Sequence, residues 1–345
     1  MRRLRIILLI FLLQIFVSCS NNSHKIVYQK TGVKQNLFSI SIVDNNTVWI
    51  SGSSGRILKT IDGGKNWKIC TSPLQKKFSF RGIYAFNKDT CIVMSVGAPG
   101  YIFKTYDGGK TWGQKYWNPD PDIFLNSIDF WDDEKGIVVG DPCCGGFTVL
   151  VTNDQGETWS RIPIKNIPSP SEGEIQYASS NSCIAVSDSG LAWFVTGGTE
   201  SRIFKTTDYG KTWKVFKTPV VNGAELRGIF STAFYDSLTG IVAGGKYLKP
   251  SDTDNTFAIT HDGGETWTQP DSMPPIGFCS CAIFPFTNDK NTILTAGLNG
   301  IAVTYNMGLT WELLSNKSFN VIKFSDKDQF GWAAGNSGQI AKIIW

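Results

Sequence analysis

An eight-residue motif, Thr-x-Asp-x-Gly-x-Thr-Trp, recurs six times along the chain, and we call each copy an Asp box. The third positions of the boxes are Asp62, Asp107, Asp154, Asp208, Asp262 and Asn306. Successive boxes are separated by 45, 47, 54, 54 and 44 residues, which is the length of one four-stranded blade of a β-propeller. The repeat therefore predicts an all-β ring of similar blades.

Each repeat has the same internal order, which is clearest in the first one. Residues 38–44 and 47–52 have the pattern of two strands, 56–62 form a third that runs into the box, and 66–70 form a fourth. Within a box, the carboxylate can accept hydrogen bonds from turn N–H groups, glycine supplies positive φ, and tryptophan packs across neighbouring strands. The six boxes are therefore predicted to be structural hairpins.

The C-terminal residues 319–345 repeat the first three strands of a blade a seventh time and contain no box. A fourth strand is available at the other end of the chain, in residues 26–30. Pairing these segments closes the ring and removes the open sheet edges. The predicted fold class is a seven-bladed β-propeller with Asp-box hairpins, in which the N-terminal strand completes the C-terminal blade.

Composition agrees with many tight turns and with a nearly neutral protein. The chain has 35 glycines, 14 prolines and 12 tryptophans, and only 18% of its residues are charged. Its formal net charge is +4, and three of the basic residues, Arg2, Arg3 and Arg5, lie in a segment that we expect to be removed. So small a charge argues against nucleic acid as a main partner.

The first 19 residues have the features of a secretory signal, with a basic start and an apolar run from Ile6 to Leu13. The sequence Phe16-Val17-Ser18-Cys19 resembles a bacterial lipobox, in which the cysteine is acylated; ordinary cleavage that leaves a free Cys19 is the alternative. We expect a lipoprotein signal peptide ending at Cys19 in 1–19, a short tether in 20–24 and the propeller in 25–345. Because no acidic run follows Cys19, the expected location is the periplasmic face of the outer membrane.

Seven further cysteines follow Cys19, an odd number that cannot form a complete disulfide framework. Most are expected to be small buried apolar residues. The adjacent Cys143 and Cys144 and the alternating Cys279 and Cys281 are the pairs that could react. Because the chain contains only two histidines, neither pair has the spacing of a histidine-containing zinc site, and no metal or cofactor is predicted.

The loops opposite the boxes are the predicted binding surface. The extra residues of the two long intervals fall in turns on that face, in 167–174, 195–202, 220–226 and 244–255. The candidate binding residues there are Arg81, Asp141, Glu174, Arg227, Lys246 and Lys249, which could hold a carboxylate, a phosphate or an acidic peptide. The alternative is that these charges satisfy one another and the loop backbone, and close the tunnel.

Four segments and the six boxes resemble a known family. The segments are SFRGIYAF (79–86), GIVVGDP (136–142), ELRGIF (225–230) and FGWAAGNSGQIAK (330–342). They resemble the BNR/Asp-box superfamily, and more closely the photosystem II stability and assembly factor family with its non-photosynthetic bacterial relatives, over residues 25–345. The resemblance implies a scaffold-like protein that assists the assembly of membrane complexes, although some relatives are named oxidoreductases.

Two enzymatic hypotheses stand beside a membrane-tethered, non-catalytic protein that binds a protein or peptide. A sialidase-like glycoside hydrolase also carries Asp boxes on a propeller, but it needs tunnel-facing arginines and a tyrosine nucleophile. Here Arg161 follows a box on an outer strand and Tyr305 lies inside a box. An oxidoreductase would need a nucleotide-binding motif or metal ligands, and the chain has no Gly-x-Gly-x-x-Gly between a strand and a helix. We therefore assign no catalytic residue, and the sequence names no small-molecule ligand.

Overall fold

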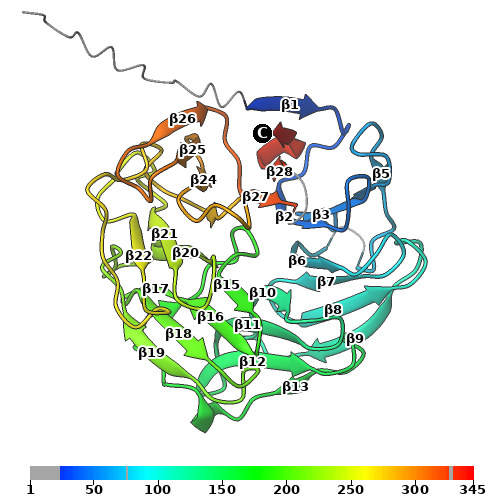
Figure 1. Cartoon of the computed structure of the whole chain (residues 1–345). Coiled ribbons are helices and arrows are strands. Elements are labelled where there is room, and N and C mark those ends of the chain that lie inside the picture. Colours follow the sequence, from blue (N-terminus) through cyan, green and yellow to red (C-terminus); the bar gives the residue numbers. More distant parts are fainter. Residues whose placement is uncertain (1–23, 75–76, 326–328) are drawn as a thin grey trace, which may run out of the picture.

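The computed structural model describes residues 24–74, 77–325 and 329–345, so the predicted signal peptide and Cys19 lie outside the described residues. Seven β-sheets surround a central axis (Figure 1), which confirms the seven-bladed propeller. In the described part of the chain, the only helical elements are two short 3-10 turns, Ile164–Asn166 and Asn336–Gly338. No helix in that part is long and apolar enough to cross a membrane.

The blades follow one another along the chain, each with its first strand nearest the axis. Blade 1 is β2 (Leu37–Ile42), β3 (Val48–Gly52), β4 (Ile57–Thr60) and β5 (Lys68–Ile69); blade 2 is β6 (Phe80–Ala85), β7 (Cys91–Ser95), β8 (Gly100–Thr105) and β9 (Gly113–Asn118). Blade 3 is β10 (Leu125–Phe130), β11 (Gly136–Cys143), β12 (Gly146–Thr152) and β13 (Ser160–Arg161); blade 4 is β15 (Ile184–Ser187), β16 (Leu191–Val195), β18 (Arg202–Thr206) and β19 (Lys214–Lys217). Blade 5 contains β20 (Arg227–Phe234), β21 (Gly240–Lys246) and β22 (Phe257–Thr260), and the sheet also includes β14 (Glu174–Ile175) and β17 (Gly197–Gly198). Blade 6 is β23 (Cys281–Ile283), β24 (Ile293–Gly297), β25 (Gly300–Thr304) and β26 (Glu312–Ser315).

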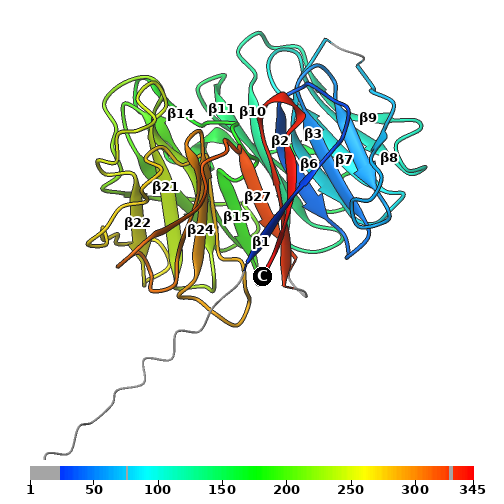
Figure 2. The ribbon, with the colours of Figure 1, turned by 90° about the horizontal axis from the view of Figure 1, so that it is seen from above.

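Blade 7 joins the two ends of the chain. It consists of β27 (Val321–Phe324), β28 (Phe330–Ala334), β29 (Ile340–Ile344) and β1 (Lys25–Gln29). β1 pairs antiparallel with β29, with Lys25 opposite Ile344 and Gln29 opposite Ile340. The predicted ring closure is therefore confirmed. β1 begins beside the end of β29, at the same end of the ring (Figure 2).

The two faces of the ring carry different loops. The face with the six Asp boxes, which we call the box face, also carries the turns between first and second strands. The opposite face, which we call the rim face, carries the turns between second and third strands and the connections between blades. The end of β29 and the start of β1 occupy the box-face position in blade 7.

Side chains within each Asp box hold the turn together. In box 1 the Thr60 hydroxyl donates to Asp62 Oδ1 at 2.8 Å, and Thr60 Oγ1 accepts from the Gly64 N–H at 3.0 Å. The same Asp62 oxygen accepts from the Asn66 N–H at 2.9 Å. Box 6 keeps this pattern, since the side-chain oxygen of Asn306 accepts the matching hydroxyl and N–H groups. The boxes are structural hairpins, as the sequence predicts.

Boxes also fasten their blades to the preceding ones. The glycine at the fifth position of a box lies against a buried second-strand side chain of the preceding blade, in the pairs Gly64 and Trp332, Gly109 and Trp49, Gly156 and Ile92, and Gly264 and Trp193. A Cβ at Gly64 would collide with the Trp332 indole, so this position requires glycine on steric grounds in addition to its φ of 87°. The repeat thus encodes the contact between blades as well as the turn.

A buried lysine makes a further link between blades 2 and 3. The Lys104 side chain is fully buried, and its Nζ donates to the Gln155 carbonyl at 2.8 Å and to Glu157 Oε1 at 2.6 Å. Lys115 Nζ lies 2.6 Å from the other oxygen of Glu157. Burial opposes ionisation of Glu157, but the hydrogen bonds from the two lysines lower its pKa to about 2. A buried ammonium group needs such a partner, and box 3 supplies it.

Protonation of the box aspartates should lower the free energy of unfolding in acid. Burial raises the pKa of Asp262, yet hydrogen bonds from the Thr266 hydroxyl and N–H outweigh it and lower that pKa to about 2. Aspartate in an unfolded chain titrates near ~3.9. Because the folded-state pKa is the lower one, ionised Asp262 stabilises the fold above about pH 4, and this contribution is lost as the pH falls toward 2.

Asp262→Asn should therefore lower the melting temperature at pH 7, with a gap to the wild type that closes as the pH falls. Asn306→Asp is the matched control, because it introduces the same titration into box 6. Its melting temperature relative to the wild type should be highest near neutral pH and should decline in acid. Thermal unfolding between pH 2 and 7 measures both. Differences that stay constant with pH in both variants would contradict the argument.

Candidate binding surface

Two loops of the rim face form strands that the sequence does not reveal. β14 and β17 pair with each other, with Glu174 opposite Gly198, and β17 continues onto β20 through Gly197 and Gly228. Because β20 is the innermost strand of blade 5, these additions extend that sheet toward the axis. The predicted loops 167–174 and 195–202 are thus fixed parts of the ring.

The segment 176–182, which follows β14, reaches the centre of the ring, where residues 180–182 line the central cavity. Arg81 Nη1 donates to the Ala178 carbonyl at 2.6 Å, and the Ser180 hydroxyl donates to the Ser280 carbonyl at 2.6 Å. These partners come from blades 2 and 6, and further hydrogen bonds join the segment to β10 and β20. One segment therefore bonds to the inner strands of several blades and closes the tunnel at its rim end.

Tyr177 of this segment belongs to a cluster of aromatic side chains. The Tyr177 and Phe230 rings are stacked with centroids 4.0 Å apart, and Phe278 meets Phe230 edge-on at 4.7 Å. Tyr247 adds a second edge-on contact to Phe278 at 5.4 Å. Such pairs stabilise a packed cluster by roughly 0.5–1.5 kcal/mol each beyond simple burial. These rings therefore pack together at the rim end of the inner strands.

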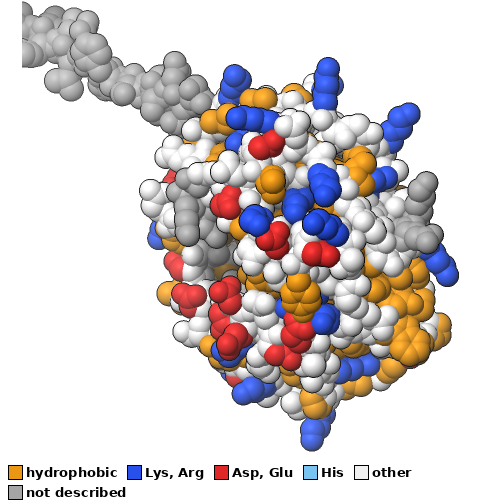
Figure 3. All heavy atoms as spheres, turned by 90° about the vertical axis from the view of Figure 1, so that its right-hand side faces the viewer, with side chains coloured by type: hydrophobic (Ala, Val, Ile, Leu, Met, Phe, Trp, Pro, Cys, Tyr) orange, Lys and Arg blue, Asp and Glu red, His pale blue; other side chains and the backbone are white. Residues whose placement is uncertain are grey.

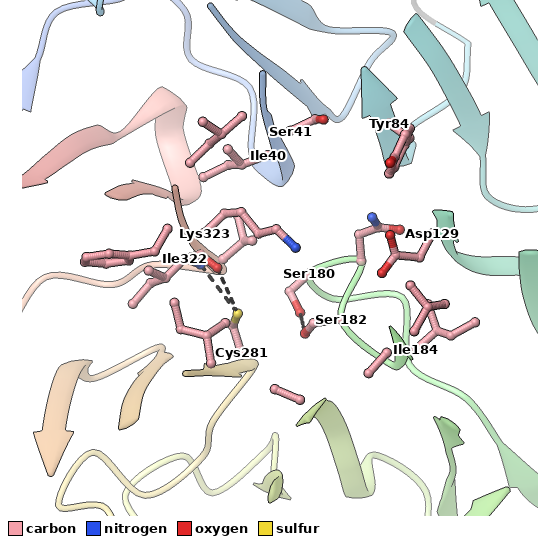
Figure 4. A pocket seen from close by; sticks show the side chains of 18 of the residues that line it. Ile40, Ser41, Tyr84, Asp129, Ser180, Ser182, Ile184, Cys281, Ile322 and Lys323 are labelled. Carbon is pink, nitrogen blue, oxygen red and sulfur yellow. Dashed lines mark hydrogen bonds between the residues drawn. The ribbon is translucent and has the colours of Figure 1, made fainter. Parts of the chain in front are cut away.

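A cavity of about 430 Å³ lies on the other side of this closure. It is lined by the inner strands of all seven blades and by residues 180–182. Lys323 extends from β27 toward the middle of the cavity, opposite Asp129 of β10 (Figure 4). The lining reaches the ends of the inner strands, so the cavity extends toward the box face. This placement differs from the predicted tunnel mouth, which the sequence put among the rim loops.

Two predicted site residues, Glu174 and Asp141, form hydrogen bonds with other parts of the chain. Glu174 is buried, forms an ion pair with Arg202, and accepts hydrogen bonds from the Ser171 N–H at 2.8 Å and the Thr196 hydroxyl at 2.6 Å. Asp141 accepts hydrogen bonds at 2.8 Å from the Gln176 N–H and the Asn126 amide, and burial raises its pKa to about 6. Both carboxylates hold loop backbone, which matches the structural alternative stated for them.

Arg81 has a similar role on the opposite side of the rim. Its guanidinium stacks on the Phe38 ring at 4.2 Å in addition to its bond with the Ala178 carbonyl. Burial lowers its pKa, and the nearby Tyr247 opposes that shift. Arg81 and Arg227 belong to the first strands of two different blades, β6 and β20, and Arg81 is held in place by its hydrogen bond.

The remaining predicted residues lie close together in blade 5: Arg227 begins β20, Lys246 ends β21, and Lys249 follows in the connection after β21. Arg227 and Lys246 are opposite each other in the β20–β21 register. Lys246 Nζ lies 2.6 Å from Asp252 and 3.7 Å from Asp254. Within the described residues, Arg227 and Lys249 form no ion pair, and Lys249 is exposed. Two cationic side chains are thus available to a partner at this corner.

Sequence reasoning missed two apolar residues beside these cations. Tyr247 and Leu248 are 42% and 75% exposed, and they follow Lys246 directly. The signal was present in the phrase 244–255, where two large apolar side chains interrupt a polar loop. We call Arg227, Tyr247, Leu248 and Lys249 the rim patch.

The outer side of the ring differs from the rim patch because its surface charges are of both signs (Figure 3). Where β5 and β9 lie, lysine and arginine are interspersed with aspartate and glutamate (Figure 3). Trp117 on β9 is 53% exposed.

The box tryptophans pack as predicted; for example, Trp67 meets Trp332 edge-on at 5.4 Å. Trp67 thus packs between blades 1 and 7, whereas Trp159 packs on Phe130 of its own blade.

The cysteines of the described residues are all free thiols. Cys279 and Cys281 are buried, and burial raises the pKa of the Cys279 thiol to about 12. Cys143 is buried at the end of β11, whereas Cys144 is exposed. Cys279 and Cys281 are therefore small buried residues, as the sequence predicts.

Comparison with known proteins agrees with this architecture. A model of the family described as photosynthesis system II assembly factor YCF48 matches residues 19–119 and 85–268. The chloroplastic photosystem II stability/assembly factor HCF136 of Arabidopsis thaliana is 25% identical over 247 residues, which is 66% of this chain and 57% of that protein. The match thus spans little more than half the length of that curated relative.

The solved structures of similar fold include two YCF48 proteins. The structure described as YCF48 bound to D1 peptide has a TM-score of 0.65 and 15% identity, and the alignment covers 94% of this chain and 97% of that one. YCF48 from Cyanidioschyzon merolae has a TM-score of 0.66 and 17% identity over 92% and 98% of the two chains. Because the family model matches well over half of the sequence, the chain belongs to the photosynthesis system II assembly factor YCF48 family.

Proposed function

We propose that this protein is a non-catalytic binding protein that holds a protein or peptide on its rim face while a lipid on Cys19 tethers it to a membrane. The observation that carries the binding role is the rim patch, in which exposed Tyr247 and Leu248 lie beside Arg227 and Lys249. An aromatic and an aliphatic anchor beside cationic side chains suits an apolar segment that carries carboxylates.

Relatives support a partner of this class. One solved relative is YCF48 bound to D1 peptide, and the curated relative is named as a photosystem II stability/assembly factor. By analogy, the partner of this chain would be a protein of a membrane complex, held during its assembly. The closed centre of the rim face favours a surface contact over a ligand threaded into the tunnel.

A photo-crosslinking experiment tests the rim patch directly. A photoreactive amino acid placed at Leu248, which is 75% exposed, should give covalent adducts with one membrane protein in the native host. Adding Arg227→Ala and Lys249→Ala should reduce the adduct yield at least about tenfold, because rim charges guide and hold an acidic segment. Mass spectrometry identifies the crosslinked peptide.

The matched control is Ile61 in box 1, which is 61% exposed on the box face. The same photoreactive group at Ile61 should give none of those adducts. If Ile61 gives the same adducts as Leu248, or if the double charge variant crosslinks as well as its parent, the rim assignment is wrong.

The tether is tested separately. Cys19→Ser should move the protein from the membrane fraction to the soluble fraction and should abolish incorporation of labelled fatty acid. Acyl chains on one cysteine suffice for anchoring because each buried CH₂ contributes about 0.8 kcal/mol. Unchanged membrane association and labelling in the variant would refute the lipid anchor. The crosslinking result does not depend on this outcome.

A further inference from the structure

Three potential metal ligands converge at a hairpin of the rim face. Cys143 ends β11, Gly146 begins β12, and the two turn residues between them have φ values of 58° at Cys144 and 96° at Gly145. Two-residue hairpins favour such left-handed positions, normally with asparagine or glycine at the first of them. A cysteine there is unusual, and it places two neighbouring thiols on one side of the turn.

The third ligand comes from the connection between β9 and β10. Cys143 Sγ and Cys144 Sγ are 3.1 Å apart, and Cys144 Sγ lies 3.0 Å from Asp120 Oδ2. The other carboxylate oxygen, Asp120 Oδ1, accepts the Asp122 N–H at 2.9 Å, which aims Oδ2 at the thiols. Among the residues that the structure describes, this is the one group of three such side chains whose ligand atoms lie within 4.8 Å of one another.

We infer that Cys143, Cys144 and Asp120 bind a thiophilic divalent ion of the zinc class. Two sulfur ligands select against magnesium and calcium, whereas sulfur with carboxylate oxygen suits Zn²⁺ or Cd²⁺. Each thiol loses its proton to solvent as its sulfur–metal bond forms. The exposed side of Cys144 leaves a fourth position for water or for a group of a partner.

The geometry needs only a small adjustment. Two sulfurs bound to one tetrahedral zinc at ~2.3 Å lie roughly 3.8 Å apart, so the present separation must widen by less than about 1 Å. Cys144 can supply this movement because it is exposed on a turn. Cys143 stays in place, since the Arg161 guanidinium donates to its carbonyl at 2.6 Å. A search of the sequence for cysteine and histidine spacing misses this group, because its third ligand is the carboxylate of Asp120, 23 residues before Cys143.

Titration of the reduced full-length protein with Cd²⁺ tests the site. We expect saturation at one ion per chain with a thiolate-to-cadmium charge-transfer band in the ultraviolet, and competition by Zn²⁺ in equilibrium dialysis. Asp120→Asn should weaken binding about tenfold or more, and Cys143→Ser with Cys144→Ser should abolish it. Circular dichroism checks that each variant keeps its fold.

Asp122→Asn is the matched control, because Asp122 is an exposed neighbour that contributes only its backbone N–H. It should bind Cd²⁺ as the wild type does. The inference fails if the reduced protein takes up no stoichiometric ion, if the double serine variant binds equally well, or if the two thiols only form a disulfide with each other. The site is independent of the proposed protein-binding role.

Discussion

Replacing Glu174 by alanine is expected to lower the free energy of unfolding by about 3–5 kcal/mol. The Glu174 side chain is fully buried and that of Arg202 is only 14% exposed, so the variant would leave a guanidinium without its counter-charge. It would also remove the acceptor of the Ser171 N–H and the Thr196 hydroxyl. Denaturant unfolding followed by fluorescence measures the loss.

Glu172→Gln is the control for this prediction, because Glu172 is an exposed acid two residues away. It should change stability by no more than about 0.5 kcal/mol. The same position also tests the sialidase-like hypothesis, in which a glutamate would polarise the tyrosine nucleophile. A Glu174→Gln variant of unchanged stability that has lost a measurable glycosidase activity would overturn the structural role.

Trp332→Ala should cost a similar amount, about 3–5 kcal/mol. Trp332 is fully buried on β28, and its indole lies between Gly64 and Trp67 of box 1. Removing it opens a cavity at the contact between blade 7 and blade 1, where the ring closes. The same unfolding measurement should show the loss.

Trp117→Ala provides the matched comparison, since Trp117 is 53% exposed on β9. Its removal should have little effect on stability. Equal losses at the two positions would show that the contact between blades 7 and 1 carries no special weight, contrary to the packing seen at Gly64.

The parts of this structure that repeat are the parts that the sequence predicts. The spacing of Asp62 and its five counterparts is enough to place the blades, because each box satisfies its own turn and packs on the preceding blade. Ring closure by residues 26–30 follows from the incomplete seventh repeat. These features depend on local hydrogen bonds and periodicity, which a single sequence contains.

The site is harder to predict because its contacts join distant segments. Segment 176–182 forms hydrogen bonds with residues of four other blades. Its amino-acid composition does not predict which residues these are. Glu174 and Asp141 have the charges of ligand-binding residues, yet they hold loop backbone. Only the tertiary structure separates such residues from Arg227 and Lys249, which remain available.

The point at which the chain enters the ring would set the orientation of the molecule on a bilayer. β1 begins at the box-face end of blade 7, with Lys25 opposite Ile344. Five residues, 20–24, separate it from Cys19, and at full extension they span about 17 Å. An anchor at Cys19 would therefore turn the Asp boxes toward the lipid headgroups and leave the rim patch facing away, toward the soluble domains of neighbouring membrane proteins.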